Sequence, residues 1–288
     1  MTSLILTADD FGASPEVNEA VERAHRQGVL TAASLMTAAP GASEAVQIAR
    51  RNPRLGVGLH VVLVEGRPVL PPEQVSELVD AQGLFRTDMA RAGATMFFVP
   101  AARRQLEAEI TAQFEAFAAT GLPLDHVNAH KHFHLHPTIA GLILKIGRRF
   151  GMRAARLPIE PAAVLALAEP GGAWRGEPVV DLWAGLARRR FRAAGITVPD
   201  QVFGLRWSGA VTPARLLGLV RHLPPGLSEI YLHPATGPYR GSAPGYAYAQ
   251  ELDALLDPQV IAAARRDGVA LGAFADLVKP QLNREPVA

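Results

Sequence analysis

The chain has 288 residues, of which 49% are hydrophobic and 19% charged, a globular composition that excludes a disordered chain and is enough for one large domain. A formal net charge of +2 and a pI near 9.2 make the protein mildly basic. The chain has no cysteine, which excludes disulfide bonds, thiolate metal sites and cysteine nucleophiles and is typical of a cytoplasmic protein.

Arginines occur in short clusters, as at 103–104, 148–149 and 188–190. Such clusters are typical of the solvated outer faces of helices, so we expect no nucleic-acid partner, while peripheral contact with an anionic membrane stays open. The first residues lack the basic region of a signal peptide, and no stretch reaches the roughly 18 hydrophobic residues of a membrane span. We expect a cytoplasmic protein, with the inner face of the membrane as a second location.

The first 28 residues predict a strand, a loop and a helix. Leu4–Leu6 is a short hydrophobic run typical of a strand buried on both faces, and it leads to Asp9 and Asp10. A serine N-cap, Pro15 in the first turn and hydrophobic residues at helical spacing predict the helix, which Gly28 ends. The two aspartates therefore follow a parallel strand, at the edge where barrels and open sheets build their sites.

The same unit recurs along the chain. Further strands are expected at 29–36, 55–63, 122–129, 152–158, 202–207, 227–233 and 269–271, and helices at 43–51, 100–119, 137–151, 179–194 and 213–222. Seven or eight such units favour an irregular TIM-barrel-like α/β barrel, one domain that spans residues 1–288.

Two long stretches, 64–99 and 160–178, are predicted as insertions into this barrel. Each contains a hydrophobic run, at 96–99 and at 164–167. These runs would form either an apolar mouth for a lipid or part of the core, and we expect core.

Residues 125–137 hold five of the nine histidines. His130, His132, His134 and His136 alternate with other residues, so an extended backbone would place them on one face. Four adjacent imidazoles cannot all be charged, whereas a divalent cation would use some of them as neutral ligands. A surface run that binds metal without any chemistry is the alternative.

The candidate catalytic and metal-binding residues lie at four predicted strand ends, which carry Asp9 and Asp10, His60, His130 and His233. One carboxylate and two imidazoles leave positions for water and substrate on a catalytic metal, and Asp10, His60 and His130 fit this count. Asp9 points away from Asp10 unless the chain bends. Each residue also has a structural alternative, as a helix cap, a buried core histidine or a turn residue, but together they favour a site.

Five motifs resemble the YdjC/ChbG-like carbohydrate deacetylases. They span nearly the whole chain in the family's order: Thr7–Gly12, Gly58–His60, His130–His134 with Pro137, Arg156–Glu160 and Glu229–Pro234. Residues 128–137 and 202–209 look like the hopanoid-biosynthesis-associated HpnK branch of that family.

The resemblance implies a TIM-barrel-like fold and metal-dependent removal of acetyl groups from N-acetylated sugars. It implies Asp10, His60 and His130 as ligands of one divalent metal ion. Asp9 would be the catalytic base and His233 the catalytic acid. Within the HpnK branch the substrate would be an N-acetylglucosamine attached to a hopanoid lipid, so the expected partner is a glycolipid or an N-acetyl sugar. A homodimer stays open.

Other polar residues would support this site. His132 and His134 are expected to contact substrate or metal ligands. Arg156 would hold Asp9 ionised or bind sugar hydroxyls, with a surface salt bridge as the alternative. The donor set suits zinc but also magnesium, manganese, cobalt or iron.

Two positions depart from the family pattern. Asn128 and Ala129 stand where the family often has aspartate and serine, and Ala235 replaces the usual glycine after the last His-Pro pair. An asparagine offers only a neutral carbonyl to a neighbouring ligand, so the supporting role of a carboxylate is not assured at position 128.

Two other functions fit parts of the pattern. A metal-dependent phosphoesterase also uses aspartate and histidine at strand ends, but it usually holds two metals and has cationic side chains for phosphate. A non-catalytic metal-storage or sugar-binding protein would use the histidine run alone.

Overall fold

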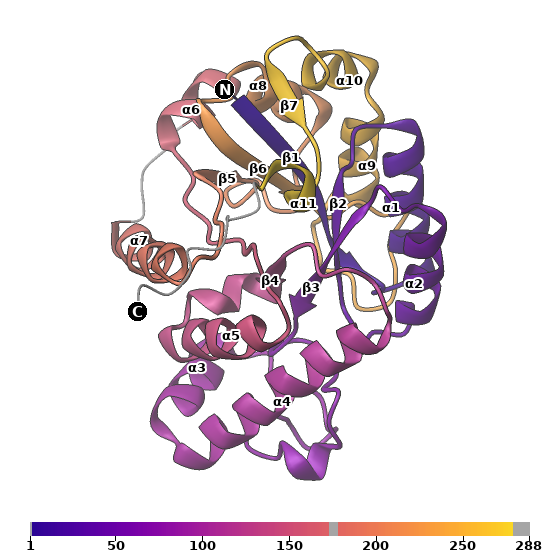
Figure 1. Ribbon diagram of the computed structural model, residues 1–288. Coiled ribbons are helices and arrows are strands. Elements are labelled where there is room, and N and C mark those ends of the chain that lie inside the picture. Colours follow the sequence, from indigo (N-terminus) through magenta and orange to yellow (C-terminus); the bar gives the residue numbers. More distant parts are fainter. Residues whose placement is uncertain (1, 173–177, 279–288) are drawn as a thin grey trace, which may run out of the picture.

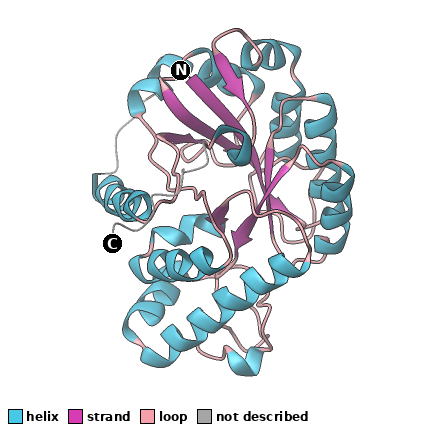
Figure 2. Cartoon of the chain, in the orientation of Figure 1, coloured by secondary structure: helices cyan, strands magenta, loops and turns pink. Residues whose placement is uncertain are grey.

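The computed structural model describes residues 2–172 and 178–278. Its parallel strands form one seven-stranded sheet that curls into a half barrel, with helices around its outer face (Figures 1 and 2). The strands are β1 (Thr2–Phe11), β2 (Ala32–Leu35), β3 (Gly56–Val61), β4 (Val127–Ala129), β5 (Gln201–Phe203), β6 (Gly226–Leu232) and β7 (Val269–Leu271). Their order is β4-β3-β2-β1-β6-β5, and β7 also pairs with β1. The predicted TIM-barrel-like α/β fold is confirmed.

Most of the helices lie between strands in the chain and pack on the outside of the sheet, whereas the last one follows the final strand (Figure 2). They are α1 (Pro15–Gln27), α2 (Ala42–Arg51), α3 (Met89–Phe98), α4 (Pro100–Ala119), α5 (Pro137–Arg149), α6 (Ala162–Ala168), α7 (Pro178–Ala193), α8 (Pro213–Arg221), α9 (Tyr248–Leu256), α10 (Pro258–Ala264) and α11 (Phe274–Leu277), with short 3-10 helices η1 (Pro72–Gln74) and η2 (His130–Leu135). Helices α1, α4, α5, α8 and α10 begin at proline, whose missing N–H costs nothing in the first turn.

Alternate residues of β1 face two different environments, because successive side chains of a strand point to opposite faces. Leu4 and Leu6 belong to the main hydrophobic core between the sheet and its helices. Ile5 packs in a small separate cluster with Ala32 and Phe274. This second cluster forms a hydrophobic floor on the inner side of the half barrel, closed by α11.

Above this floor the interior of the half barrel is polar. Thr7 and Asp9 follow Ile5 on the same face of β1, and both are buried. Arg156 and Glu229 are also fully buried. Because an isolated buried charge is costly, such a layer is stable only if its charges pair with one another.

The histidine run is not extended, contrary to the prediction. Residues 130–135 form η2, in which Lys131 and His132 have positive φ angles of 54° and 53°. The chain has to turn back from β4, at the edge of the sheet, into α5. A tight turn therefore replaces the strand, and the histidines do not share one face.

Other predicted strands are shorter than expected. The stretch 152–158 forms only isolated bridges, Val127 with Ala155 and Ala154 with Thr197. The strands expected at 29–36 and 122–129 are confined to β2 and β4. These segments approach or leave the sheet as loops, which a hydrophobic run does not distinguish from strand.

The stretches predicted as insertions contain helices. Residues 64–99 include η1 and α3, and 160–178 include α6, although 173–177 lie outside the described residues. Met96 and Leu165 are buried, as expected for core, but Phe98 is 75% exposed and Leu167 57% exposed. The expectation of core was therefore wrong for the outward side of each run. Among the described residues, no helix is long and hydrophobic enough to cross a membrane.

Candidate metal centre and active site

The end of β1 bends so that both aspartates face the same space. Asp10 has a φ of 61°, in the left-handed region that few residues other than glycine adopt. The register between β1 and β2 shifts between Ala8 and Phe11. Asp9 and Asp10 therefore both line one cavity of about 670 Å³. The chain has the bend without which the two side chains would point to opposite faces of the strand.

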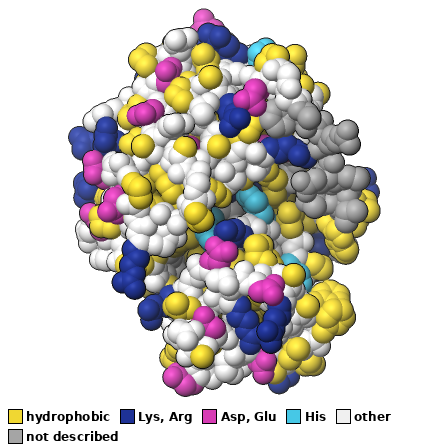
Figure 3. All heavy atoms as spheres, turned by 180° about the vertical axis from the view of Figure 1, so that it is seen from behind, with side chains coloured by type: hydrophobic (Ala, Val, Ile, Leu, Met, Phe, Trp, Pro, Cys, Tyr) yellow, Lys and Arg dark blue, Asp and Glu magenta, His cyan; other side chains and the backbone are white. Residues whose placement is uncertain are grey.

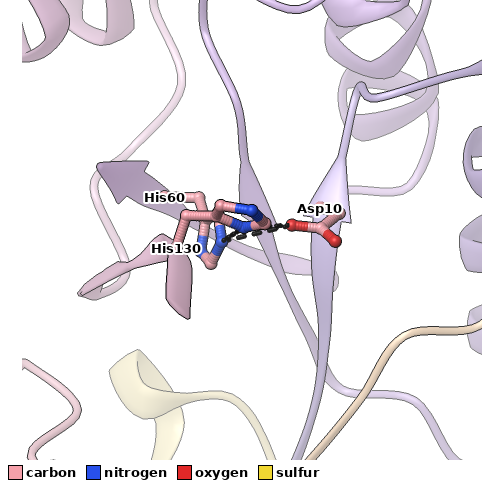
Figure 4. Close-up of side chains that lie close together, drawn as sticks. All are labelled: Asp10, His60 and His130. Carbon is pink, nitrogen blue, oxygen red and sulfur yellow. Dashed lines mark hydrogen bonds and ion pairs between the residues drawn. The ribbon is translucent and has the colours of Figure 1, made fainter. Parts of the chain in front are cut away.

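Asp10, His60 and His130 converge from the ends of β1 and β3 and the start of η2 (Figure 4). Asp10 Oδ1 lies 3.3 Å from His60 Nε2 and 3.1 Å from His130 Nδ1, and the two nitrogens are 3.4 Å apart. Donor atoms about 2.0–2.1 Å from a tetrahedral ion lie roughly 3.3 Å from one another. The spacing and chemistry of these donors fit one divalent cation.

Hydrogen bonds determine which nitrogen of His60 faces this position. Asn128 Nδ2 donates to Asp9 Oδ1 at 3.1 Å, and Asn128 Oδ1 lies 2.6 Å from His60 Nδ1. Because the Asp9 carboxylate can only accept, the amide nitrogen of Asn128 must face it and the carbonyl must face His60. His60 Nδ1 therefore donates, and Nε2 keeps its lone pair for a metal.

Asn128 is thus a positioning residue that the sequence reasoning undervalued. The register of the sheet pairs it directly with His60. As a neutral residue it accepts from His60 Nδ1, as a supporting carboxylate would, and it also donates to Asp9. Because aspartate in its place could not donate, asparagine suits a position beside a second carboxylate.

Arg156 joins two buried carboxylates. Its Nη1 and Nη2 donate to Asp9 at 2.5 and 3.0 Å, and its Nε and Nη2 donate to Glu229 Oε1 at 3.0 and 2.8 Å. Thr7 Oγ1 donates to the same Glu229 oxygen at 2.8 Å. The guanidinium also packs over the Tyr231 ring, 4.4 Å from its centre. The alternative of a surface salt bridge is therefore wrong, because Arg156 is fully buried against Asp9.

These contacts control the charges of the site. Burial is the largest single effect and would raise the pKa of Asp9, but the charge and hydrogen bonds of Arg156, together with the charges of His60 and His233, hold that pKa well below its usual range. The pKa of Asp10 is also lowered, against the effect of burial, by His130 and His60. Burial would lower the pKa of His60, yet the carboxylates raise it. Protons would therefore compete with a metal cation for the same negative site.

His132 and His134 differ in position, although both follow His130 in η2. His132 lines the cavity, and its Nε2 lies 2.7 Å from the Tyr231 hydroxyl oxygen. His134 is buried, and it does not line the cavity. Burial lowers the pKa of His132 and lowers that of His134 to about 3, so both imidazoles are neutral near pH 7.

His233 follows β6 and reaches the same cavity from the other side. Its backbone N–H donates to Glu251 Oε2 at 2.5 Å, and its Nδ1 lies 3.9 Å from that oxygen. Burial lowers the pKa of His233 and raises the pKa of Glu251 to about 7. Sequence reasoning missed Glu251, because an acid within the pattern of a hydrophobic helix gives no signal of its buried position.

The cavity combines polar and hydrophobic walls. Histidine side chains are visible in a hollow on the face seen in Figure 3. Its other lining residues include the tyrosines Tyr239, Tyr246 and Tyr248, the cations Arg67, Lys131 and Arg240, and the hydrophobic Met36, Leu84, Phe85 and Met89. The tyrosines were not predicted from the sequence as site residues. A lining of both polar and hydrophobic side chains suits a ligand with both characters.

Fold and site together define a parallel α/β half barrel with a candidate Asp–His–His metal centre at the carboxyl ends of its strands. A profile of the YdjC-like protein family matches residues 3–266. The chain therefore belongs to the YdjC-like family, as the sequence motifs indicated. The narrower HpnK branch stays a prediction.

Several proteins curated as carbohydrate deacetylases are similar to this chain. The one from Geobacillus stearothermophilus is 31% identical over 280 residues, which cover 96% of this chain and 98% of that protein. The one from Brevibacillus brevis is 40% identical over 147 residues, 51% of this chain and 56% of that protein. A crystal structure from Enterococcus faecalis V583, described as a proposed cellobiose-phosphate cleavage protein, has the same fold, with a TM-score of 0.76, 23% identity and coverage of 96% and 99%.

Removing two donors is expected to abolish metal binding. We expect the wild-type protein to bind one divalent ion per chain and the double variant Asp10→Ala/His60→Ala to bind none, because one imidazole remains. Equilibrium dialysis followed by elemental analysis measures this. His222→Ala, which removes an exposed histidine at the end of α8, is the control and should bind as the wild type does. Full occupancy of the double variant would contradict this ligand set.

Proposed function

We propose that this protein is a metal-dependent carbohydrate N-deacetylase, which hydrolyses the acetamide of an N-acetylated sugar. The observation that carries this proposal is the placement of an ionised Asp9, held by Arg156, beside three donors that fit a metal ion. His233 lines the same cavity. The relatives curated as carbohydrate deacetylases support the same activity for this chain.

Asp10, His60 and His130 would hold the cation. When bound, it supplies Lewis acidity, which polarises the acetamide carbonyl and lowers the pKa of a water molecule. Zinc suits two imidazoles and a carboxylate, and magnesium, manganese, cobalt and iron are the alternatives that metal reconstitution would compare.

Asp9 and His233 would move the proton. Asp9 accepts a proton from the water as its oxygen bonds to the acetyl carbon. Because burial lowers the pKa of His233, its imidazole is neutral in the resting site and receives the proton that Asp9 has accepted. His233 then donates this proton to the sugar nitrogen as the C–N bond breaks, which releases a free amine and acetic acid, and the acid gives up its remaining proton to the solvent to become acetate.

The rival functions fit the arrangement less well. A phosphoesterase usually holds two metals. Among residues 2–172 and 178–278, a single group of three His or carboxylate residues has its donor atoms close enough together to hold one ion. A metal-storage protein that used the histidine run alone would need its imidazoles on one face, but η2 disperses them. Hydrolysis of an acetamide gives a role to Asp9, to the three metal donors and to His233.

Removing either proton carrier is expected to slow the reaction without loss of the metal. Asp9→Asn and His233→Ala should each lower the rate of acetate release from an N-acetylglucosamine conjugate by about a hundredfold or more, because each removes a group that transfers a proton in the reaction. Metal content is measured on the same samples, with His222→Ala as the control. Unchanged rates in variants that still bind metal would overturn these roles.

We further propose that the substrate is a glycolipid, an N-acetylglucosaminyl hopanoid. The hydrophobic side chains Leu84, Phe85 and Met89 line the same cavity as the polar residues that would take the sugar. The exposed Phe98 and Leu167 offer further apolar surface for peripheral contact with a membrane. Such a substrate would place the protein at the inner face of the membrane.

The lipid acceptor is tested by comparing substrates. We expect kcat/KM for a hopanoid glycoside in detergent to exceed that for free N-acetylglucosamine and for chitobiose by at least about tenfold, since burial of apolar surface contributes to binding. Substituting Leu84→Ser should reduce this preference and leave the rate on free sugar unchanged. Equal values for all three substrates would exclude the lipid acceptor while leaving deacetylation intact.

A further inference from the structure

Three buried polar residues have no part in the chemistry described above. Asp125 lies just before β4, His126 follows it, and Ser34 lies on β2; Ser34 and His126 are fully buried, and Asp125 is 7% exposed. His126 Nδ1 lies 2.9 Å from Asp125 Oδ2, and His126 Nε2 lies 2.9 Å from Ser34 Oγ. Asn128 Nδ2 donates to Ser34 Oγ at 2.9 Å. The chain of contacts thus leads from Asp125 to the asparagine that orients His60.

The direction of each hydrogen bond follows from the carboxylate at its end. Asp125 can only accept, so His126 Nδ1 donates to it, while the other Asp125 oxygen accepts from the Ala275 backbone N–H at 2.8 Å. With a single proton on the ring, at Nδ1, Nε2 accepts from the Ser34 hydroxyl. Ser34 Oγ accepts from the Asn128 amide, because the amide nitrogen can only donate.

Two glycines of β3 make room for this arrangement. A Cβ atom on Gly58 would lie 2.6 Å from the His126 ring, and one on Gly56 would lie 2.7 Å from the Asp125 carboxylate. Both distances are shorter than contacts that real Cβ atoms make. Residues 56, 58 and 60 share one face of the strand, so the face that ends in His60 accommodates Asp125 and His126. The His126 ring also stacks on Phe274 of α11, with centroids 4.6 Å apart.

We infer that Asp125, His126 and Ser34 are positioning residues for the metal centre. The Asn128 amide has two N–H groups, and they are bound by Asp9 and by Ser34. The second bond holds the amide plane, so that its carbonyl stays against His60 Nδ1 and the lone pair of Nε2 stays toward the cation. This role rests on the proposed function, because it acts through a metal ligand.

Zinc affinity tests this inference separately from catalysis. We expect Ser34→Ala and His126→Phe to raise the Kd for Zn²⁺ about tenfold, measured by competition with a chromophoric chelator, since loss of such outer partners weakens metal binding by 10–100-fold. At saturating zinc, the KM for the N-acetyl sugar should stay unchanged. Phenylalanine keeps a ring against Phe274, and Ser34→Ala is a milder change that preserves the fold if His126→Phe does not.

Ser228→Ala is the matched control, because Ser228 is a fully buried serine of β6 whose hydroxyl accepts from Gln201 and not from the site. Its melting temperature should fall about as far as that of Ser34→Ala, while its Kd for Zn²⁺ stays at the wild-type value. A Kd within twofold of wild type in both Ser34→Ala and His126→Phe would overturn the inference, as would an equal rise in Ser228→Ala. Failure of the wild-type protein to bind any of the divalent ions Zn²⁺, Mg²⁺, Mn²⁺, Co²⁺ and Fe²⁺ would overturn the proposed function and this inference with it.

Discussion

A single buried guanidinium makes the polar interior of this half barrel possible. Arg156 is fully buried between Asp9 of β1 and Glu229 of β6, so its positive charge is shared by two carboxylates that would otherwise be buried alone. Loss of one partner from such a group typically costs about 3–5 kcal/mol, because the remaining charge stays buried without compensation. The pairing therefore fixes Asp9 as a carboxylate at the centre of the sheet, where β1 and β6 are neighbours.

The geometry of the candidate metal centre follows from that fixed charge. A carboxylate that only accepts determines how the Asn128 amide is turned, and the amide determines which nitrogen of His60 carries the proton. The strained backbone of Asp10, of a kind that costs about 1–3 kcal/mol, is retained at the same place. A rigid polar layer thus supports the donors from below, while the open cavity above them remains free for a substrate.

The sequence predicted the parts of this arrangement that depend on strand ends. Asp9, Asp10 and His60 follow hydrophobic runs, and the carboxyl ends of parallel strands meet at one edge, so their convergence could be foreseen. The conformation of residues 130–136 could not be foreseen, because histidines at alternate positions are compatible with both a strand and a tight turn. The pairing of Arg156 with Glu229 joins positions 73 residues apart, and an acid within a hydrophobic strand gives no sign of its partner. Long-range pairs of this kind depend on tertiary packing.

The central claim is that the Asp9–Asn128 pair selects the nitrogen with which His60 binds metal. The NMR signals of the imidazole nitrogens, recorded after titration with cadmium and assigned with a His60→Asn variant, test it directly. The predicted result is coupling between cadmium and Nε2 of His60, with a proton on Nδ1. Coupling to Nδ1, or a proton on Nε2, would contradict it.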